Sequence, residues 1–184
     1  MSSGDIDDVL APEGELEQFR LEQPALDEYL SRAWQFKPIR TFFIPFAAGI
    51  SHDGNRVYIS YDIQTNIEGV ECESALVRHE TTEWALREFC DIGEDYASDP
   101  RGHRLGNRAE SNRAESLLGR PDAWELYSEI IDPQVIRTER ENLRGKPIPR
   151  DLALYPYDEG MAERLMEEMW SERSFEEWNR LLNK

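Results

Sequence analysis

The 184-residue sequence has few of the residues from which many functional sites are built, since it holds two cysteines and three histidines. Cys72 and Cys90 are too few for a disulfide framework or a paired-cysteine zinc site, and we expect both to be buried thiols. It also lacks a glycine-rich phosphate loop, a nucleophile elbow and a dinucleotide fingerprint, so nucleotide-dependent chemistry is not expected.

Long apolar runs are missing too. No run approaches the roughly 18 residues needed to cross a bilayer, and the N-terminal residues MSSGDIDDVL are acidic, unlike a signal peptide. We therefore expect a cytoplasmic protein without a membrane partner.

Basic residues are outnumbered: 21 Lys and Arg stand against 38 Asp and Glu, which gives a net charge of −17. This charge disfavours nucleic acid as a partner of the whole protein, because phosphates would be repelled. It favours a solvated surface or a cationic partner. Residues 1–30 contribute nine of the acids, with Arg20 as their one basic residue. We expect residues 1–14 to form a disordered acidic tail, because they are poor in apolar spacing.

Apolar and turn residues predict the order of the first elements. Apolar spacing favours a helix over residues 15–36, in which Pro24 starts the second half. Residues 41–62 are rich in aromatic and β-branched side chains, and Asp-Gly-Asn at 53–55 supplies a turn whose glycine can take a positive dihedral angle. These residues predict a β-hairpin.

Helices dominate the rest of the chain. We expect one helix over residues 70–89 and another that begins at Asp99-Pro100, a cap acceptor followed by proline. Short helical segments follow at 124–131 and 135–143, and then a proline-rich connection and two terminal helices, with a capping box at Ser174 and Glu177. We therefore predict a single α+β domain over residues 15–184, mostly helical around a small β-hairpin, with a C-terminal helical extension.

The segment His-Glu-Thr-Thr-Glu at 79–83 lies inside the helix expected at 70–89. His79 and Glu83 are four positions apart, so they project from one side of a helix and can both reach a cation about 2 Å from each donor atom. Glu80 lies next to them and is free to act as a base. The segment therefore predicts part of a metal site.

The following helix supplies the other candidate ligands. His103 and Glu110 are seven positions apart and share a helical face. Two of the three histidines thus fall in adjoining helices, whereas His52 precedes the Asp-Gly turn and is interpreted as a turn residue. The predicted ligands are His79, Glu83 and His103, with Glu110 either a fourth ligand or a residue that holds one of the others.

The H-E-x-x-E segment resembles the active-site helix of zincin-type metallopeptidases, whose usual pattern is H-E-x-x-H. Glutamate-type zincins add a Glu ligand about twenty residues later, on the next helix. Here Glu83 stands where the family has His, and His103 stands where it has Glu. The resemblance covers roughly residues 56–110, including an expected strand before the motif helix, where zincins place an edge strand that aligns an extended peptide.

The resemblance implies a zincin-like fold and a metal-dependent hydrolase that acts on a peptide or protein substrate. Two histidines and one carboxylate would hold a catalytic zinc with one position open for water, and Glu80 would be the general base. The number of carboxylates also suits Mn²⁺ or Fe²⁺.

Two other interpretations remain. The chain could be a non-catalytic acidic adaptor or structural protein, for example of phage or mobile-element origin, that keeps a zincin-like frame; Glu83 favours this interpretation. It could also be a metal-free helical binding module, in which His79, Glu83 and His103 only hydrogen-bond and the acidic surface meets a basic partner.

Overall fold

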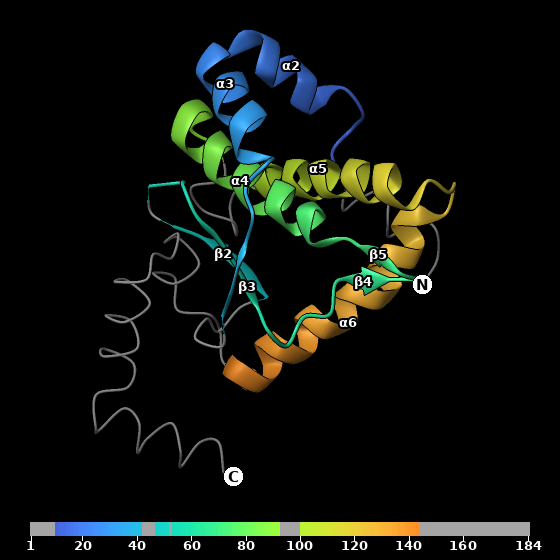
Figure 1. The fold of residues 1–184 in the computed structure, drawn as a ribbon. Coiled ribbons are helices and arrows are strands. Elements are labelled where there is room, and N and C mark those ends of the chain that lie inside the picture. Colours follow the sequence, from blue (N-terminus) through green and yellow to red (C-terminus); the bar gives the residue numbers. More distant parts are fainter. Residues whose placement is uncertain (1–9, 42–46, 52, 93–99, 144–184) are drawn as a thin grey trace, which may run out of the picture.

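The computed structural model describes residues 10–41, 47–51, 53–92 and 100–143. Within these ranges the chain forms five helices and two small sheets in a mixed α+β arrangement (Figure 1). The helices are α2 (Glu15–Glu22), α3 (Pro24–Ala33), α4 (Glu73–Cys90), α5 (Arg101–Leu118) and α6 (Ala123–Leu143). The strands are β1 (Ile39–Thr41), β2 (Ala48–Ile50), β3 (Val57–Ser60), β4 (Asn66–Ile67) and β5 (Val70–Glu71). The predicted α+β class is therefore confirmed.

The first predicted helix is divided in two. Gln23 leaves the helical conformation, and Pro24 begins α3, where its missing N–H costs no hydrogen bond. The helix ends at Ala33 and not at Phe36. The expected acidic tail partly overlaps the described chain: Ala11 is buried, and its N–H donates to the carbonyl of Arg104 on α5. At least this residue of the expected tail is packed against the body of the protein.

The three-stranded sheet has the order β1-β3-β2, so β3 is central and β2 lies at an edge. The expectation that the strand before the motif helix, which is β3, would be an edge strand is therefore wrong. Strands β2 and β3 pair antiparallel, which confirms the predicted hairpin, and Gly54 in its turn has a φ of 68°. The parallel pairing of β1 with β3 was not expected from the sequence. Arg40 on β1 stabilises it, because its guanidinium donates to the carbonyls of Ser60 and Ile63.

A second, two-stranded sheet precedes the motif helix. Strands β4 and β5 are joined by Glu68 and Gly69, which have φ values of 51° and 86°, as a type I′ hairpin turn requires. The predicted helix start near residue 70 is therefore wrong. Helix α4 begins at Glu73, after the hairpin has brought Cys72 into the core.

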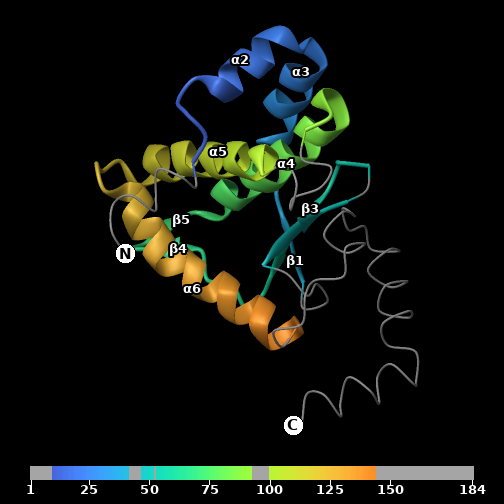
Figure 2. The same cartoon turned by 180° about the vertical axis from the view of Figure 1, so that it is seen from behind.

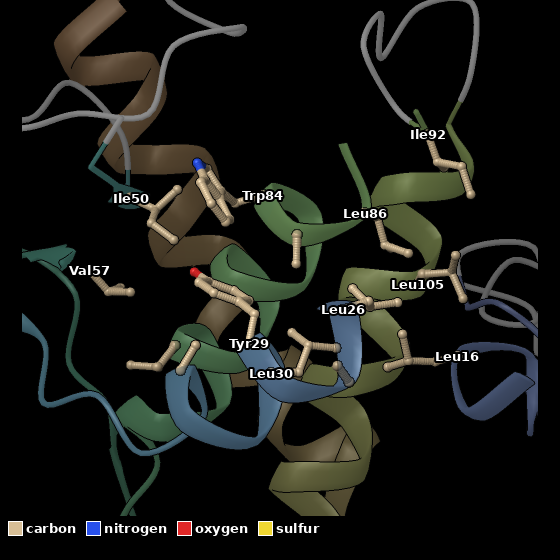
Figure 3. Packing of buried hydrophobic residues seen from close by; sticks show 14 of the residues in the cluster. Leu16, Leu26, Tyr29, Leu30, Ile50, Val57, Trp84, Leu86, Ile92 and Leu105 are labelled. Carbon is tan, nitrogen blue, oxygen red and sulfur yellow. The ribbon is translucent and has the colours of Figure 1, made fainter. Parts of the chain in front are cut away.

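Helices α4 and α5 form the middle of the molecule, with α2 and α3 on one side and the strands and α6 on the other (Figures 1 and 2). The buried residues on the α2–α3 side form one cluster (Figure 3). There Tyr29 packs against Trp84 with ring centroids 4.7 Å apart, and its hydroxyl donates to the carbonyl of Gly54 in the hairpin turn. Trp84 is therefore a core residue, as predicted.

Helix α6 is continuous, whereas the sequence predicted two short helices at 124–131 and 135–143. Pro133 lies inside it and removes one backbone hydrogen bond. Tyr127 and Ile131 are buried in a second hydrophobic cluster, on the side of the strands, together with Ile59, Ile63 and Ile67. This burial anchors the first half of the helix. Beyond the proline, the side chain of Gln134 donates to the carbonyls of Gln64 and Ile130. These contacts outweigh the local effect of the proline.

None of the helices in the described ranges combines the length and apolar character needed to cross a membrane. The expected C-terminal extension, with the capping box at Ser174 and Glu177, lies outside the described residues, as do residues 1–9 and His52.

Candidate metal centre

Helix α4 brings His79 and Glu83 together, as their spacing predicted. They lie one turn apart, and Nε2 of His79 is 3.1 Å from Oε1 of Glu83. The His79 ring is almost buried, whereas about a third of the Glu83 side chain is exposed. The pair therefore faces the boundary between protein and solvent, where a site must open if water or substrate is to reach it.

Helix α5 contributes the third side chain. Nδ1 of His103 lies 2.6 Å from the same Glu83 oxygen, and the two imidazole rings stand edge to face with centroids 4.9 Å apart. The ligand atoms of His79, Glu83 and His103 all lie within 4.8 Å of one another. One cation could contact all three after small side-chain movements.

Gly106 permits this close approach of α5 to α4. A Cβ at this position would lie 2.9 Å from Cγ of Glu83 and 3.4 Å from Cε1 of His79. Glycine in a helix interior costs roughly 1 kcal/mol relative to alanine. This cost is consistent with a requirement for space beside the two side chains.

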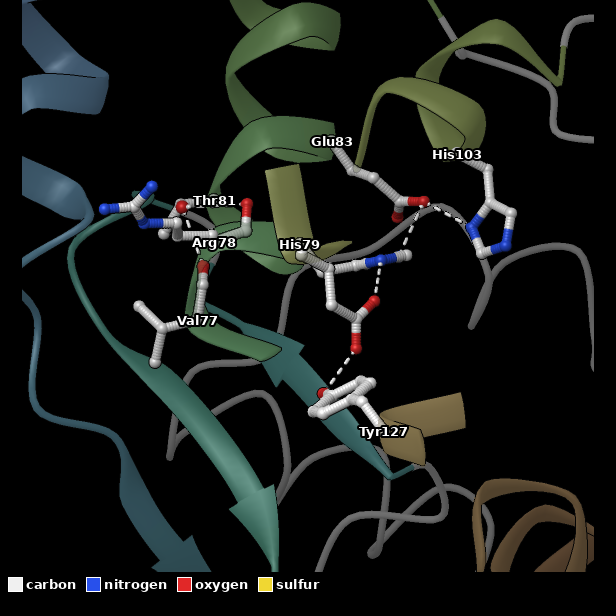
Figure 4. Close-up of polar contacts among 8 residues, drawn as sticks. Val77, Arg78, His79, Thr81, Glu83, His103 and Tyr127 are labelled. Atoms are coloured by element: carbon white, nitrogen blue, oxygen red, sulfur yellow. Dashed lines mark hydrogen bonds and ion pairs between the residues drawn. The ribbon is translucent and has the colours of Figure 1, made fainter. Parts of the chain in front are cut away.

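Glu110 lies behind His79, on the far side of the imidazole from Glu83. The Nδ1–H group of His79 donates to Oε2 of Glu110 at 2.8 Å, and the hydroxyl of Tyr127 on α6 donates to Oε1 at 2.6 Å (Figure 4). Of the two roles expected for Glu110, this geometry corresponds to a residue that holds a ligand. A carboxylate on the second nitrogen of a metal-binding histidine fixes the ring and its tautomer.

The two carboxylates that flank His79 control its charge. Burial alone would lower the pKa of His79, but the charges of Glu83 and Glu110 outweigh it and raise the pKa well above its usual value. Burial likewise opposes ionisation of Glu83, yet His79 and His103 together hold its pKa well below the usual range. Without a cation, the site is therefore a network of an imidazolium and carboxylates.

The environment of the Glu80 carboxyl group disfavours its ionised form. Burial raises its pKa to about 7; the charge of His79 opposes this shift, and the nearby carboxylates of Glu83 and Glu110 add to it. A group with a pKa near neutrality can both accept and return a proton. Glu80 therefore has the proton affinity expected of a general base or acid.

Tyr127 completes the network. Its pKa is raised well above the usual value by burial and by the neighbouring Glu110 carboxylate, so the phenol keeps its proton and remains a hydrogen-bond donor. No sequence pattern indicated a role for Tyr127, because it lies on a third helix with no fixed spacing from the motif. A signal for Gly106 was present, as an isolated glycine within a predicted helix.

The structure thus brings together the predicted residues His79, Glu83 and His103, places Glu110 behind His79, and leaves Glu80 beside them on α4. This set fits a divalent cation, because it offers two imidazoles and one carboxylate at the site and a carboxylate that orients one imidazole. No protein-family model, no curated protein and no solved structure matches this chain.

Proposed function

We propose that this protein is a metal-dependent hydrolase of the zincin type that cleaves peptides or peptide-like amides. In this proposal His79, Glu83 and His103 hold one divalent cation, Zn²⁺ or alternatively Mn²⁺ or Fe²⁺. The observation that supports it best is that ligand atoms of His79, Glu83 and His103 all lie within 4.8 Å of one another. In addition, Nδ1 of His79 is hydrogen-bonded to Glu110, which leaves Nε2 for the cation.

The arrangement of the sheet is consistent with an extended substrate. Strand β2 contacts α4 and, among the described residues, pairs with β3 alone. An unpaired strand edge offers backbone N–H and C=O groups to a peptide that adds as a further strand. The proposed zincin-like frame would use β2 to align the peptide beside α4.

In the proposed hydrolysis, the cation and the surrounding residues have separate roles. A bound divalent cation would act as a Lewis acid that polarises the amide carbonyl and lowers the pKa of water. Glu80 would accept the proton of the attacking water and then deliver it to the leaving amine, which its pKa of about 7 permits. Glu110 and Tyr127 would keep the His79 ring oriented with Nε2 toward the site.

The test is elemental analysis of protein purified without chelator or affinity-tag metal. We expect about one metal per chain in the native protein, and none in the His79→Ala/His103→Ala variant. His52→Ala serves as the matched control because it removes the third histidine and should keep the metal. Full metal content in the double variant would exclude the assignment.

Activity requires a separate variant. Glu80→Gln should keep the metal, because Glu80 is not a ligand, but should lose hydrolysis of a peptide-library substrate. A Glu80→Gln variant with native activity would refute the role of Glu80 as the base, whatever the metal content.

A metal-free binding module is the second candidate. It is favoured by the distances of 3.1 Å and 2.6 Å from Glu83 to His79 and His103, which satisfy these groups without a cation. If the native protein takes up no metal after incubation with zinc or manganese, this candidate becomes the better one.

A further inference from the structure

A second group of polar side chains lies on α4, away from the metal centre. Arg78 precedes His79 in sequence, but Figure 4 shows it pointing away from His79, Glu83 and His103. Arg78 is half-buried, and its Nε group is buried without a hydrogen-bond partner. Within the described part of the chain, no carboxylate forms an ion pair with Arg78.

An aromatic ring holds the Arg78 side chain in place. Its guanidinium carbon lies 4.3 Å from the ring centroid of Trp34, and that of Arg20 lies 4.7 Å from the same centroid. Trp34 is itself fixed, because its indole N–H donates to the Thr82 hydroxyl. Arg20 has a carboxylate partner in Asp27, at 2.7 Å. Within the segments that the structure describes, the positive charge of Arg78 is therefore held in place by Trp34 without a carboxylate to neutralise it.

Arg113 brings another guanidinium to this group from α5. Its Nε–H donates to Oγ of Ser74 at 2.9 Å, and Ser74 lies one helical turn before Arg78, on the same face of α4. Among the described residues, neither the terminal N–H groups of Arg113 nor the hydroxyl hydrogen of Ser74 has an acceptor. Burial and the nearby charges of Arg113 and Arg20 lower the pKa of Arg78 to about 10, so Arg78 stays charged at neutral pH.

Among the described residues, neither Arg78 nor Arg113 has a carboxylate partner, which is unexpected in a chain with 38 acidic residues and a net charge of −17. Like charges held together repel, and an anion between them would remove the repulsion. Guanidinium groups bind oxyanions through paired N–H donors, and the Ser74 hydroxyl would add a neutral donor. We propose that Arg78, Arg113 and Ser74 bind a small oxyanion of the phosphate class.

The size of the group favours a small ligand over a macromolecule. Two guanidiniums and one hydroxyl match a single tetrahedral oxyanion, and the acidic surface of the protein would repel a polyanion such as nucleic acid. Inorganic phosphate and the phosphate group of a small monoester share this chemistry, so the test must include both.

The experiment is a calorimetric titration of the full-length chain with inorganic phosphate and with glycerol phosphate. We expect saturable binding of one anion per chain, weakened about tenfold or more in Arg113→Gln, because a charged hydrogen bond is lost. Arg120→Gln is the matched control, because Arg120 already pairs with Asp122 and Glu68. Tighter binding of the monoester would identify an organic phosphate as the ligand, and equal binding would identify the free ion.

Arg113→Gln is the decisive variant because Arg78→Gln also removes the stacking on Trp34 and could unfold the chain. The proposal is overturned if the native chain shows no saturable binding, or if Arg113→Gln binds as tightly as the native chain. The His79→Ala/His103→Ala variant should bind phosphate normally. Loss of binding in that variant would place the anion at the metal centre and would also overturn the proposal.

Discussion

Replacement of Glu80 by glutamine should stabilise the metal-free protein at alkaline pH while removing hydrolysis. Folding raises the pKa of this carboxyl from 4.5 to about 7, chiefly because burial disfavours its charge. An acid whose pKa is higher in the folded state destabilises that state once the pH exceeds the unfolded value. Glutamine has nearly the same shape and no charge, so it removes this cost.

The size of the effect follows from the two pKa values. When the carboxyl is ionised in both states, a pKa of 4.5 when unfolded and about 7 when folded corresponds to about 3 kcal/mol. Because the Glu80 side chain is partly exposed, solvent screens some of this cost, and we expect a gain of about 2 kcal/mol at pH 8. At pH 4.5 the carboxyl is mostly protonated in the folded state, and the gain should fall below about 0.5 kcal/mol.

Urea unfolding of chelator-treated protein at pH 4.5, 5.5 and 8 measures this gain. Glu88→Gln is the matched control, since Glu88 is exposed on the same helix and its replacement should change stability by less than about 0.5 kcal/mol. If Glu80→Gln is no more stable than the native chain at pH 8, or if its gain does not depend on pH, then Glu80 is not held in an unfavourable ionised state.

Three further predictions concern the groups around Glu80. Tyr127→Phe removes the hydrogen bond to Glu110 and should weaken metal affinity about tenfold, which is typical when a group that orients a metal ligand is lost. Unchanged affinity would contradict the role of Tyr127 in orienting His79 through Glu110. Gly106→Ala should weaken metal binding by at least about tenfold, because the added methyl group would contact Glu83, and it should leave the helical circular dichroism unchanged. Asn112→Ala is its control, since Asn112 is exposed on the same helix. Metal affinity should rise as the pH increases from 6 to 8, because a metal at Nε2 must displace the proton that Glu83 and Glu110 stabilise on His79. Competition titrations would show a flat profile if His79 is not a ligand.

Local spacing predicted much of this structure. The positions of His79 and Glu83 depend only on helical periodicity, and α4 places them one turn apart, as expected. The turn at Gly54 was predictable because its backbone conformation suits glycine. Proline at the start of α3 was likewise a reliable local signal.

Contacts between distant segments were not predictable in the same way. The parallel pairing of β1 with β3 depends on Arg40, which donates to carbonyls 20 and 23 residues away in the sequence. Pro133 indicated a break that the packed helix α6 does not have. Tyr127 reaches Glu110 only because α6 packs against α5, and no pattern within one helix encodes that contact.

The environment of Glu80 is also what separates the two candidate functions. A purely structural network needs His79 and Glu83, whose opposite charges stabilise each other, and the hydrogen bond between Glu83 and His103. It gains nothing from the Glu80 carboxyl, whose ionised form is disfavoured by burial and by two neighbouring carboxylates. Such unfavourable groups occur most often where a protein uses a shifted pKa for chemistry. A divalent cation would offset the negative charge that Glu80, Glu83 and Glu110 place around His79. A stability gain in Glu80→Gln, present without metal and reduced when metal is added, would therefore favour the hydrolase over the metal-free binding module.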